Sequence, residues 1–308
     1  MNPPSTATEQ RWATPDGTEL AGTLQLPNPP RREPLPAVLL INGSGPLDRN
    51  SNTDAQSLNI ARAIAEHLAT FGIASLRFDK RGTGASGGNY ATNGFNDETA
   101  DAATALHHLA NLEGINRGRI AVAGHSAGAT IAIRLAASEP AVSAAVLLAA
   151  ASSRGEHVLE WQSDRIGQTL PGPNWLTGNI FRAIQERSRA KLTDPETEQD
   201  PDAASPVSGR WLREYMTYDP ADDLQRVSCP VLAITGAKDL QVNPAELATI
   251  AALVTGPCRT EAPADLTHVL RATPKPPTIS EYRKLASTPV DPDLLNGVGT
   301  WVARTLNS

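Results

Sequence analysis

A five-residue segment, Gly124 to Gly128, constrains this chain more than any other feature. It reads Gly-His-Ser-Ala-Gly, with a serine at its centre and a glycine at each end. The apolar residues 120–123 predict a buried strand, and the Ala/Ile-rich sequence from Ala127 onward predicts a helix. A sharp turn between the two raises the serine above the sheet edge, and only small neighbours allow such a turn. The segment therefore predicts a nucleophile elbow at Ser126. The alternative is a glycine-rich turn with an incidental serine.

The rest of the chain supplies alternating strands and helices. Residues 10–26 predict a hairpin around a Pro-Asp-Gly turn. Apolar runs predict strands at 37–41, 73–79, 120–123, 142–149, 229–235 and 258–262. Helices are expected near 56–70, 96–112, 244–254 and 291–306, in addition to the one that follows Ser126. Such alternation predicts an α/β fold with a mostly parallel sheet and right-handed crossovers. We expect residues 1–150 and 219–308 to form its core.

The alternation stops between residues 151 and 218, which we expect to form a helical cap inserted between core strands. Helix-like segments at 179–192 and 209–216 flank an acidic, proline-containing loop at 194–208. Large aromatic residues gather in this insertion, and we expect them to line a substrate pocket: Trp161, Trp175, Trp211 and Tyr215. The alternative is that they only pack a helical appendage.

Composition limits the kinds of binding partner and the cellular compartment that we expect for this protein. The chain has 308 residues and a net charge of −6, which argues against nucleic acid as a partner. The N-terminal residues lack the basic head and apolar core of a secretory signal, and no apolar run is long enough to span a membrane. The two cysteines, Cys229 and Cys258, are too few for a disulfide framework. We expect a cytoplasmic protein with two buried thiols, a bridge between them being the alternative.

Three residues of complementary chemistry follow separate predicted strands, in the order Ser126, Asp239, His268. The carboxyl ends of parallel strands meet at one sheet edge, so these side chains can converge there. A neutral imidazole within hydrogen-bond reach takes the proton of a serine hydroxyl, and a carboxylate fixes the tautomer of that imidazole. The other histidines fall in predicted helices, beside the nucleophile or ahead of the acid: His67, His107, His108, His125 and His157. The competing acids precede a strand or lie in a turn: Asp222, Asp223 and Asp265.

Backbone N–H groups near Ser126 are expected to form an oxyanion hole. Ala127 begins the helix after the elbow, and Ser44 (or Gly43) lies in a glycine-rich loop after the strand at 37–41. Each such donor lowers the barrier by about 3–4 kcal/mol. Arg81 and Asp79 follow the strand at 73–79, and we expect them to brace the neighbouring loops rather than touch substrate. No His/Cys/carboxylate cluster has metal-ligand spacing, so no metal is expected.

At these residues the chain resembles a known family, the bacterial α/β-hydrolase esterases related to serine aminopeptidases and prolyl-oligopeptidase-like enzymes. The matching segments run almost from end to end: DGTELAGTLQLP (16–27), NGSGPLDRN (42–50), FDKRGTGAS (78–86), GHSAG (124–128), CPVLAITGAKDLQV (229–242) and LTHVL (266–270). The resemblance implies a carboxylesterase that acts on small acyl esters without a cofactor. The segment at 194–208 departs most from the family pattern. Hydrolysis of amides or peptides, or acyl transfer to an alcohol, uses the same triad and stays open.

Overall fold

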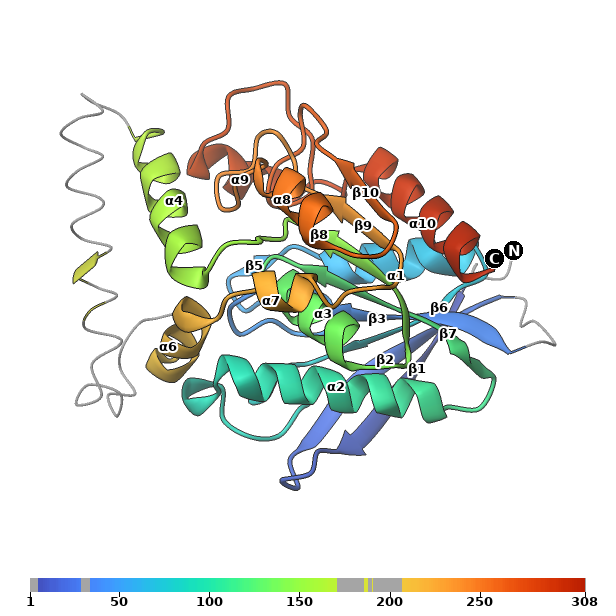
Figure 1. Cartoon of the computed structure of the whole chain (residues 1–308). Coiled ribbons are helices and arrows are strands. Elements are labelled where there is room, and N and C mark those ends of the chain that lie inside the picture. The colour runs from blue at the N-terminus through green and yellow to red at the C-terminus, as the bar shows by residue number, and fades with distance from the viewer. Residues whose placement is uncertain (1–4, 29–33, 171–185, 188–189, 191–206, 308) are drawn as a thin grey trace.

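A buried eight-stranded sheet runs through the molecule (Figure 1). The computed structural model describes residues 5–28, 34–170, 186–187, 190 and 207–307. The strand order is β1-β2-β6-β3-β7-β8-β9-β10, antiparallel from β1 to β6 and parallel from β6 to β10. The bounds are β1 Ser5–Ala13, β2 Glu19–Pro27, β3 Leu35–Ile41, β6 Ala74–Phe78, β7 Ile115–His125, β8 Val142–Leu148, β9 Val231–Ile234 and β10 Cys258–Glu261. The predicted mostly parallel sheet is confirmed.

Two helical layers cover the faces of this sheet. Along β3 the side chains alternate, so that Leu39 packs with one layer while Val38 and Leu40 pack with the other. The first layer contains α2 (Phe95–Asn111), α3 (Ala127–Ser138), α7 (Ala221–Leu224) and α8 (Glu246–Leu253). The second contains α1 (Ile60–Thr70) and α10 (Pro292–Leu306). All seven residues of β3 are buried, as expected for a strand covered on both faces.

The predicted hairpin is confirmed at the N-terminal edge of the sheet. β1 and β2 pair along their full length in antiparallel register. The turn between them has Gly17 at a φ of 85°, a conformation that favours glycine. The backbone N–H of Thr14 donates to the Thr18 carbonyl and closes the turn at 2.9 Å. The Pro-Asp-Gly sequence therefore fixes where the hairpin turns, and its glycine supplies the positive φ that the turn requires.

Local differences from the sequence prediction have identifiable causes. The helix expected at 56–70 begins only at Ile60, because β5 (Gln56–Ser57) pairs with β4 (Asn52–Thr53) in a small second sheet. The helix expected from residue 96 begins at Phe95, after the short 3₁₀ helix η1 (Tyr90–Thr92). Its N-cap is Gly94, whose N–H donates to the Asp97 carboxylate at 3.0 Å. Helices α7 and α9 (Ile279–Leu285) were not predicted.

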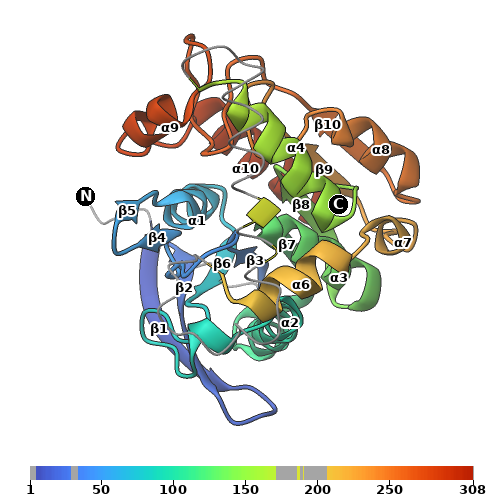
Figure 2. The ribbon, with the colours of Figure 1, turned by 90° about the vertical axis from the view of Figure 1, so that its left-hand side faces the viewer.

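The described part of the predicted cap consists mainly of two helices at one end of the molecule, α4 (Gly155–Gly167) and α6 (Gly209–Thr217) (Figures 1 and 2). Helix α6 agrees with the prediction for residues 209–216, whereas α4 was missed. Most of the helix expected at 179–192, most of the acidic loop and Trp175 lie outside the described residues.

The cysteines and two histidines differ in part from expectation. Cys229 and Cys258 are free thiols, half-buried near the starts of β9 and β10, so the alternative of a bridge is wrong. His107 is exposed as expected and pairs with Glu139 at 2.8 Å. His108 was also expected in solvent, but its ring stacks on Trp12 with a centroid separation of 4.7 Å. Burial there lowers its pKa.

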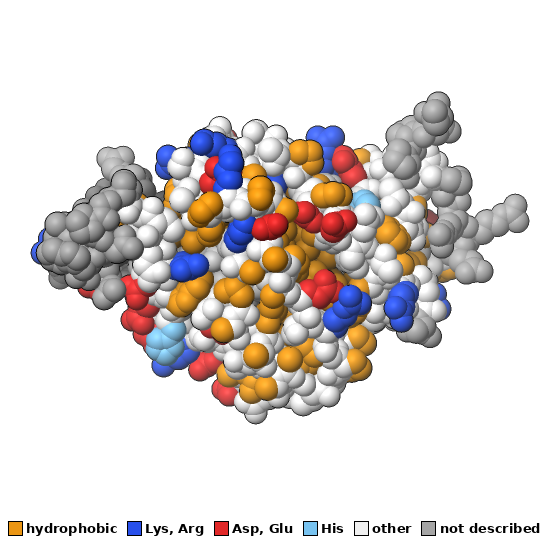
Figure 3. Space-filling model, turned by 90° about the horizontal axis from the view of Figure 1, so that it is seen from above, with side chains coloured by type: hydrophobic (Ala, Val, Ile, Leu, Met, Phe, Trp, Pro, Cys, Tyr) orange, Lys and Arg blue, Asp and Glu red, His pale blue; other side chains and the backbone are white. Residues whose placement is uncertain are grey.

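Three expectations from the sequence concern the charge of the surface, membrane-spanning helices and metal ligands. The face shown in Figure 3 mixes acidic, basic and hydrophobic side chains rather than gathering one sign of charge. Within the described ranges, no helix has both the length and the apolar character needed to cross a membrane. The same ranges contain no group of three or more His, Cys, Asp or Glu side chains placed to hold a metal ion.

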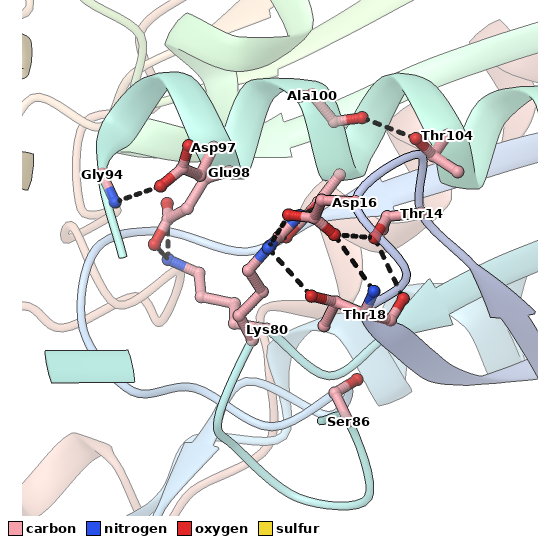
Figure 4. A network of polar contacts seen from close by, with 12 residues as sticks. Thr14, Asp16, Thr18, Lys80, Ser86, Gly94, Asp97, Glu98, Ala100 and Thr104 are labelled. Atoms are coloured by element: carbon pink, nitrogen blue, oxygen red, sulfur yellow. Dashed lines mark hydrogen bonds and ion pairs between the residues drawn. The ribbon is translucent and has the colours of Figure 1, made fainter. Parts of the chain in front are cut away.

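A buried ion pair ties the exit loop of β6 to α2 (Figure 4). Lys80 Nζ lies 2.9 Å from both carboxylate oxygens of Glu98, and only 6% and 4% of the two side chains are exposed. The neighbouring Arg81 binds Asp101 on α2 and Asp16 in the hairpin turn. The hydrogen bond from Arg81 holds the pKa of the Asp16 carboxyl well below its usual range. Charge pairing thus connects three segments that are distant in sequence.

We expect Glu98→Gln to lower the free energy of unfolding by about 3–5 kcal/mol, because it leaves the Lys80 ammonium buried without its counter-charge. The double variant Lys80→Met/Glu98→Leu removes both charges and should regain most of that loss. Urea unfolding measures both effects. The matched control is Glu66→Gln, which breaks an exposed pair with Arg62 and should cost under about 1 kcal/mol. Equal losses for Glu98→Gln and Glu66→Gln would contradict the prediction.

Candidate active site

The serine of the Gly-His-Ser-Ala-Gly segment lies at a strained turn between β7 and α3. Ser126 has φ 57° and ψ −126°, a conformation that few residues other than glycine adopt. A Cβ on Gly124 would lie 2.1 Å from the Gly128 carbonyl oxygen, and one on Gly128 would lie 2.3 Å from the Ile41 carbonyl oxygen. Both glycines are therefore required by the close approach of three backbone segments. The conformation is that of the predicted elbow.

The acid candidate is fixed by its own loop. Asp239 follows β9 and is almost fully buried, at 1% exposure. Its Oδ1 accepts hydrogen bonds from the N–H groups of Gln241 at 2.7 Å and Val242 at 2.9 Å. His268 Nδ1 lies 2.9 Å from Oδ2 and 3.1 Å from Oδ1 of the same carboxylate. The structure thus brings together Asp239 and His268, as the sequence predicted.

His268 lies in a tight turn that a buried arginine holds in place. The N–H and the hydroxyl of Thr267 both donate to the Arg271 carbonyl, at 3.0 and 2.8 Å. The Arg271 guanidinium donates to the carbonyls of Val269 at 2.6 Å and Thr288 at 3.2 Å, and also to that of Leu58. Burial lowers the Arg271 pKa to about 10. A single side chain thereby anchors the turn of His268 to two other segments of the chain.

The elbow contacts the turn of His268 through His125, a residue that was not expected to take part in the site. The His125 Nε2 lies 2.9 Å from the His268 carbonyl oxygen, so Nε2 carries the proton. The two imidazole rings are 4.9 Å apart at their centroids. In the described part of the chain no hydrogen bond joins Ser126 to His268; such bonds are often long in unliganded enzymes and tighten with substrate. The position of His125 next to the nucleophile was the only sequence signal for this contact.

The glycine-rich loop after β3 lies against the elbow. A Cβ on Gly43 would be 3.3 Å from Ser126 Cβ, and Gly43 is buried while Ser44 is exposed. The Asn42 side chain fixes this loop, because it donates to the Asp48 carbonyl at 2.7 Å and accepts from the Ser51 hydroxyl at 2.6 Å. Ala127 is the first residue of α3. Gly43 is thus the residue of this loop that lies against Ser126, while the oxyanion hole of Ala127 and Ser44 stays a prediction.

The exit loop of β6 braces the site, as the sequence predicted. The Asp79 carboxylate accepts from the backbone N–H and the guanidinium of Arg49, with contacts from 2.6 to 3.1 Å, and from the N–H of Ala85 at 2.9 Å. A Cβ on Gly84 would lie 2.4 Å from this carboxylate. Arg81 is engaged with α2 and the hairpin turn. Asp79 therefore binds its own loop and the loop of Arg49, and Arg81 binds α2 and the hairpin turn.

The aromatic residues expected to bind substrate separate into two groups. Trp211 and Tyr215 are buried, and both rings contact Phe95 edge to face at centroid distances of 5.7 and 5.5 Å. Their contacts attach α6 to α2, which favours the alternative that they pack the insertion. Trp161, in contrast, lines a cavity of about 370 Å³ that also borders Asp239.

The sheet order, the elbow and the buried Asp-His pair define the α/β-hydrolase class. Residues 55–268 match the family model of the serine aminopeptidases, S33, and the chain belongs to that family.

The relatives whose names state an activity share only a small fraction of their residues with this chain. Esterase EstD of Thermotoga maritima is 27% identical over 212 residues, which are 68% of this chain and 48% of EstD. The match thus spans about half the length of that relative. The ferulic acid complex of Est1E from Butyrivibrio proteoclasticus has a TM-score of 0.62 at 20% identity, over 95% of this chain and 96% of Est1E. The Pyrococcus furiosus esterase Pf2001 has a TM-score of 0.60 at 18% identity, over 97% and 90%. These two structures share the fold.

His125 should make stability depend on pH. Burial, with a smaller contribution from the adjacent His268, lowers its pKa from 6.5 to about 3. Between these values the unfolded chain binds a proton that the folded chain does not. The stability due to neutral His125 is therefore complete above pH 6.5 and lost as the pH falls toward 3. We expect the Tm of the wild type to approach that of His125→Gln as the pH falls from 8 to 5. A constant difference in Tm over that range would contradict a neutral His125.

Proposed function

We propose that this protein is a serine esterase that cleaves small carboxylic esters through an acyl-enzyme intermediate. Ser126 is the nucleophile, His268 the general base and acid, and Asp239 the carboxylate that orients the imidazole. The observation that carries the proposal is the buried Asp239–His268 pair, with Nδ1 2.9 Å from the carboxylate, on a loop that contacts the elbow of Ser126.

The chemistry follows from these positions. The Ser126 Oγ attacks the ester carbonyl carbon while its proton moves to His268 Nε2, since Nδ1 is held by Asp239. The N–H groups of Ala127 and of the loop at Gly43 or Ser44 hold the oxyanion. The imidazolium then donates its proton to the leaving alcohol. Water repeats the cycle on the acyl-enzyme and releases the acid, so no cofactor is needed.

Esters are favoured over amides by the relatives, and the site alone does not separate them. EstD and Est1E are named as esterases, whereas the family is named for an aminopeptidase. The cavity beside Trp161 and Asp239 is the pocket we assign to part of the substrate. A panel of p-nitrophenyl esters of increasing acyl length, run beside aminoacyl anilides, distinguishes the two activities. Faster turnover of the anilides would replace the esterase proposal with amide hydrolysis.

We expect Ser126→Ala to abolish ester turnover and leave the fold intact, because alanine fits the elbow with one atom fewer. An organophosphonate should label the wild type at Ser126 and leave the variant unlabelled, as measured by intact-protein and peptide mass spectrometry. Circular dichroism of Ser126→Ala provides the folding control. Labelling at a different serine, or turnover by the variant, would overturn the assignment of the nucleophile.

Asp239→Asn should lower kcat by about 10⁴-fold, because an amide in place of the carboxylate favours the wrong tautomer of His268. Asp265→Asn is the matched control. Asp265 lies in the same loop as His268, yet its carboxylate is exposed and pairs with Lys238 at 2.6 Å. We expect this control to keep kcat within about threefold, since exposed ion pairs contribute little. Steady-state kinetics on one p-nitrophenyl ester measures both, and the opposite ranking would transfer the role of the acid to Asp265.

A further inference from the structure

A single buried hydroxyl connects the two loops that carry Asp239 and His268. Tyr282 lies on α9 and is 5% exposed. Its hydroxyl donates to the Lys238 carbonyl at 2.6 Å. The same oxygen accepts from the N–H of Leu240 at 2.9 Å and from the N–H of His268 at 3.3 Å. A tyrosine hydroxyl has one proton to donate, and here its oxygen accepts two further bonds, so its hydrogen-bonding capacity is used on these loops.

The three backbone groups are those next to the proposed catalytic atoms. Lys238 and Leu240 are the residues on either side of Asp239, and the third N–H belongs to His268 itself. Besides the carboxylate–imidazole contact, the Lys238 N–H donates to the Leu266 carbonyl at 3.1 Å and joins the same two loops nearby. The Tyr282 hydroxyl adds another tie between these loops, and it reaches the N–H of His268 itself and the backbone on both sides of Asp239.

The tyrosine ring is held as firmly as its hydroxyl. It packs in a small buried cluster with Ile166 of α4, Leu240 and Val269. Burial raises the pKa of Tyr282, and the negative charge of Asp239 raises it further; these effects outweigh the hydrogen bonds from the N–H groups of His268 and Leu240 and the charge of Arg165, which lower it. The hydroxyl consequently keeps its proton over the working range of the enzyme and remains a donor to Lys238.

We propose that Tyr282 is a positioning residue, which holds the Asp239 carboxylate and the His268 imidazole at the separation that proton transfer requires. This inference rests on the proposed esterase function. Without the hydroxyl, two N–H groups and one carbonyl in a buried place lose their partner, and the bonds that reach the backbone on both sides of Asp239 and the N–H of His268 are lost. The Nδ1–carboxylate contact then loses the support of its backbone frame.

The test is Tyr282→Phe, which deletes one oxygen and keeps the packed ring. We expect kcat for a p-nitrophenyl ester to fall by about 10- to 100-fold, because small displacements of catalytic groups have effects of this size. KM should stay within about threefold, since Tyr282 does not touch the substrate. The acid limb of the kcat/KM–pH profile should move to lower pH, because a misaligned Asp239 stabilises the protonated imidazole less well.

The matched control is Tyr218→Phe. Its hydroxyl also donates to a protein group, the Asp223 carboxylate, but on α7, away from both loops. We expect this variant to keep the wild-type pH profile and kcat even where its Tm falls as much as that of Tyr282→Phe. Assays are run well below both melting temperatures. In addition, the proton between His268 Nδ1 and Asp239 gives a downfield NMR signal, which should shift in Tyr282→Phe and remain in place in Tyr218→Phe.

The outcomes separate this inference from the proposed function. Turnover by Ser126→Ala would overturn the esterase mechanism, and with it the positioning role of Tyr282 in that mechanism. An inactive Ser126→Ala together with a Tyr282→Phe variant that has the wild-type kcat, pH profile and downfield signal would overturn the positioning role alone. A lower Tm without any of these three changes would show that Tyr282 only packs α9.

Discussion

The close approach of three backbone segments at the elbow is the constraint on which the rest of the site depends. The end of β3, the end of β7 and the first turn of α3 meet where only Gly124 and Gly128 leave room. This packing accompanies the positive φ of Ser126 and the close approach of Gly43, in the loop after β3, to the Ser126 side chain. The chain can meet these demands only if β3 and β7 are neighbours, as they are in the sheet. The conformation of Ser126 therefore depends on the order of the strands in the sheet.

Buried charges hold the loops around that point. Asp79 binds Arg49, Lys80 binds Glu98 and Arg271 is surrounded by carbonyl oxygens. Burying each of these charges costs free energy of desolvation. The charge is tolerated only where its partners lie at hydrogen-bond distance. These contacts attach the loop after β6 to α2 and to the loop after β3, and they attach the turn of His268 to two other segments of the chain.

The sequence was sufficient for the sheet, the elbow and the Asp-His pair because each depends on local signals. Apolar runs and glycines can be recognised within short segments. The chain order then places Ser126, Asp239 and His268 each after its own strand. It was insufficient where a residue takes its role from a distant partner. His125 contacts His268 across 143 positions in the chain, and Tyr282 meets a loop more than 40 residues away. Trp211 and Tyr215 were expected at substrate, but their partner Phe95 lies far upstream, and no periodicity reveals that contact.

Helix α4 links the proposed substrate pocket to the proposed triad. One of its residues, Trp161, lines the cavity that borders Asp239, while Ile166 belongs to the buried cluster that contains Tyr282. The two residues lie five positions apart on the same helix, so a movement of α4 changes both contacts at once. Helix α4 is therefore a single element that borders both the proposed substrate pocket and the cluster of Tyr282. If the pocket binds the acyl group as we propose, this helix connects substrate binding with the proposed positioning of Asp239 and His268.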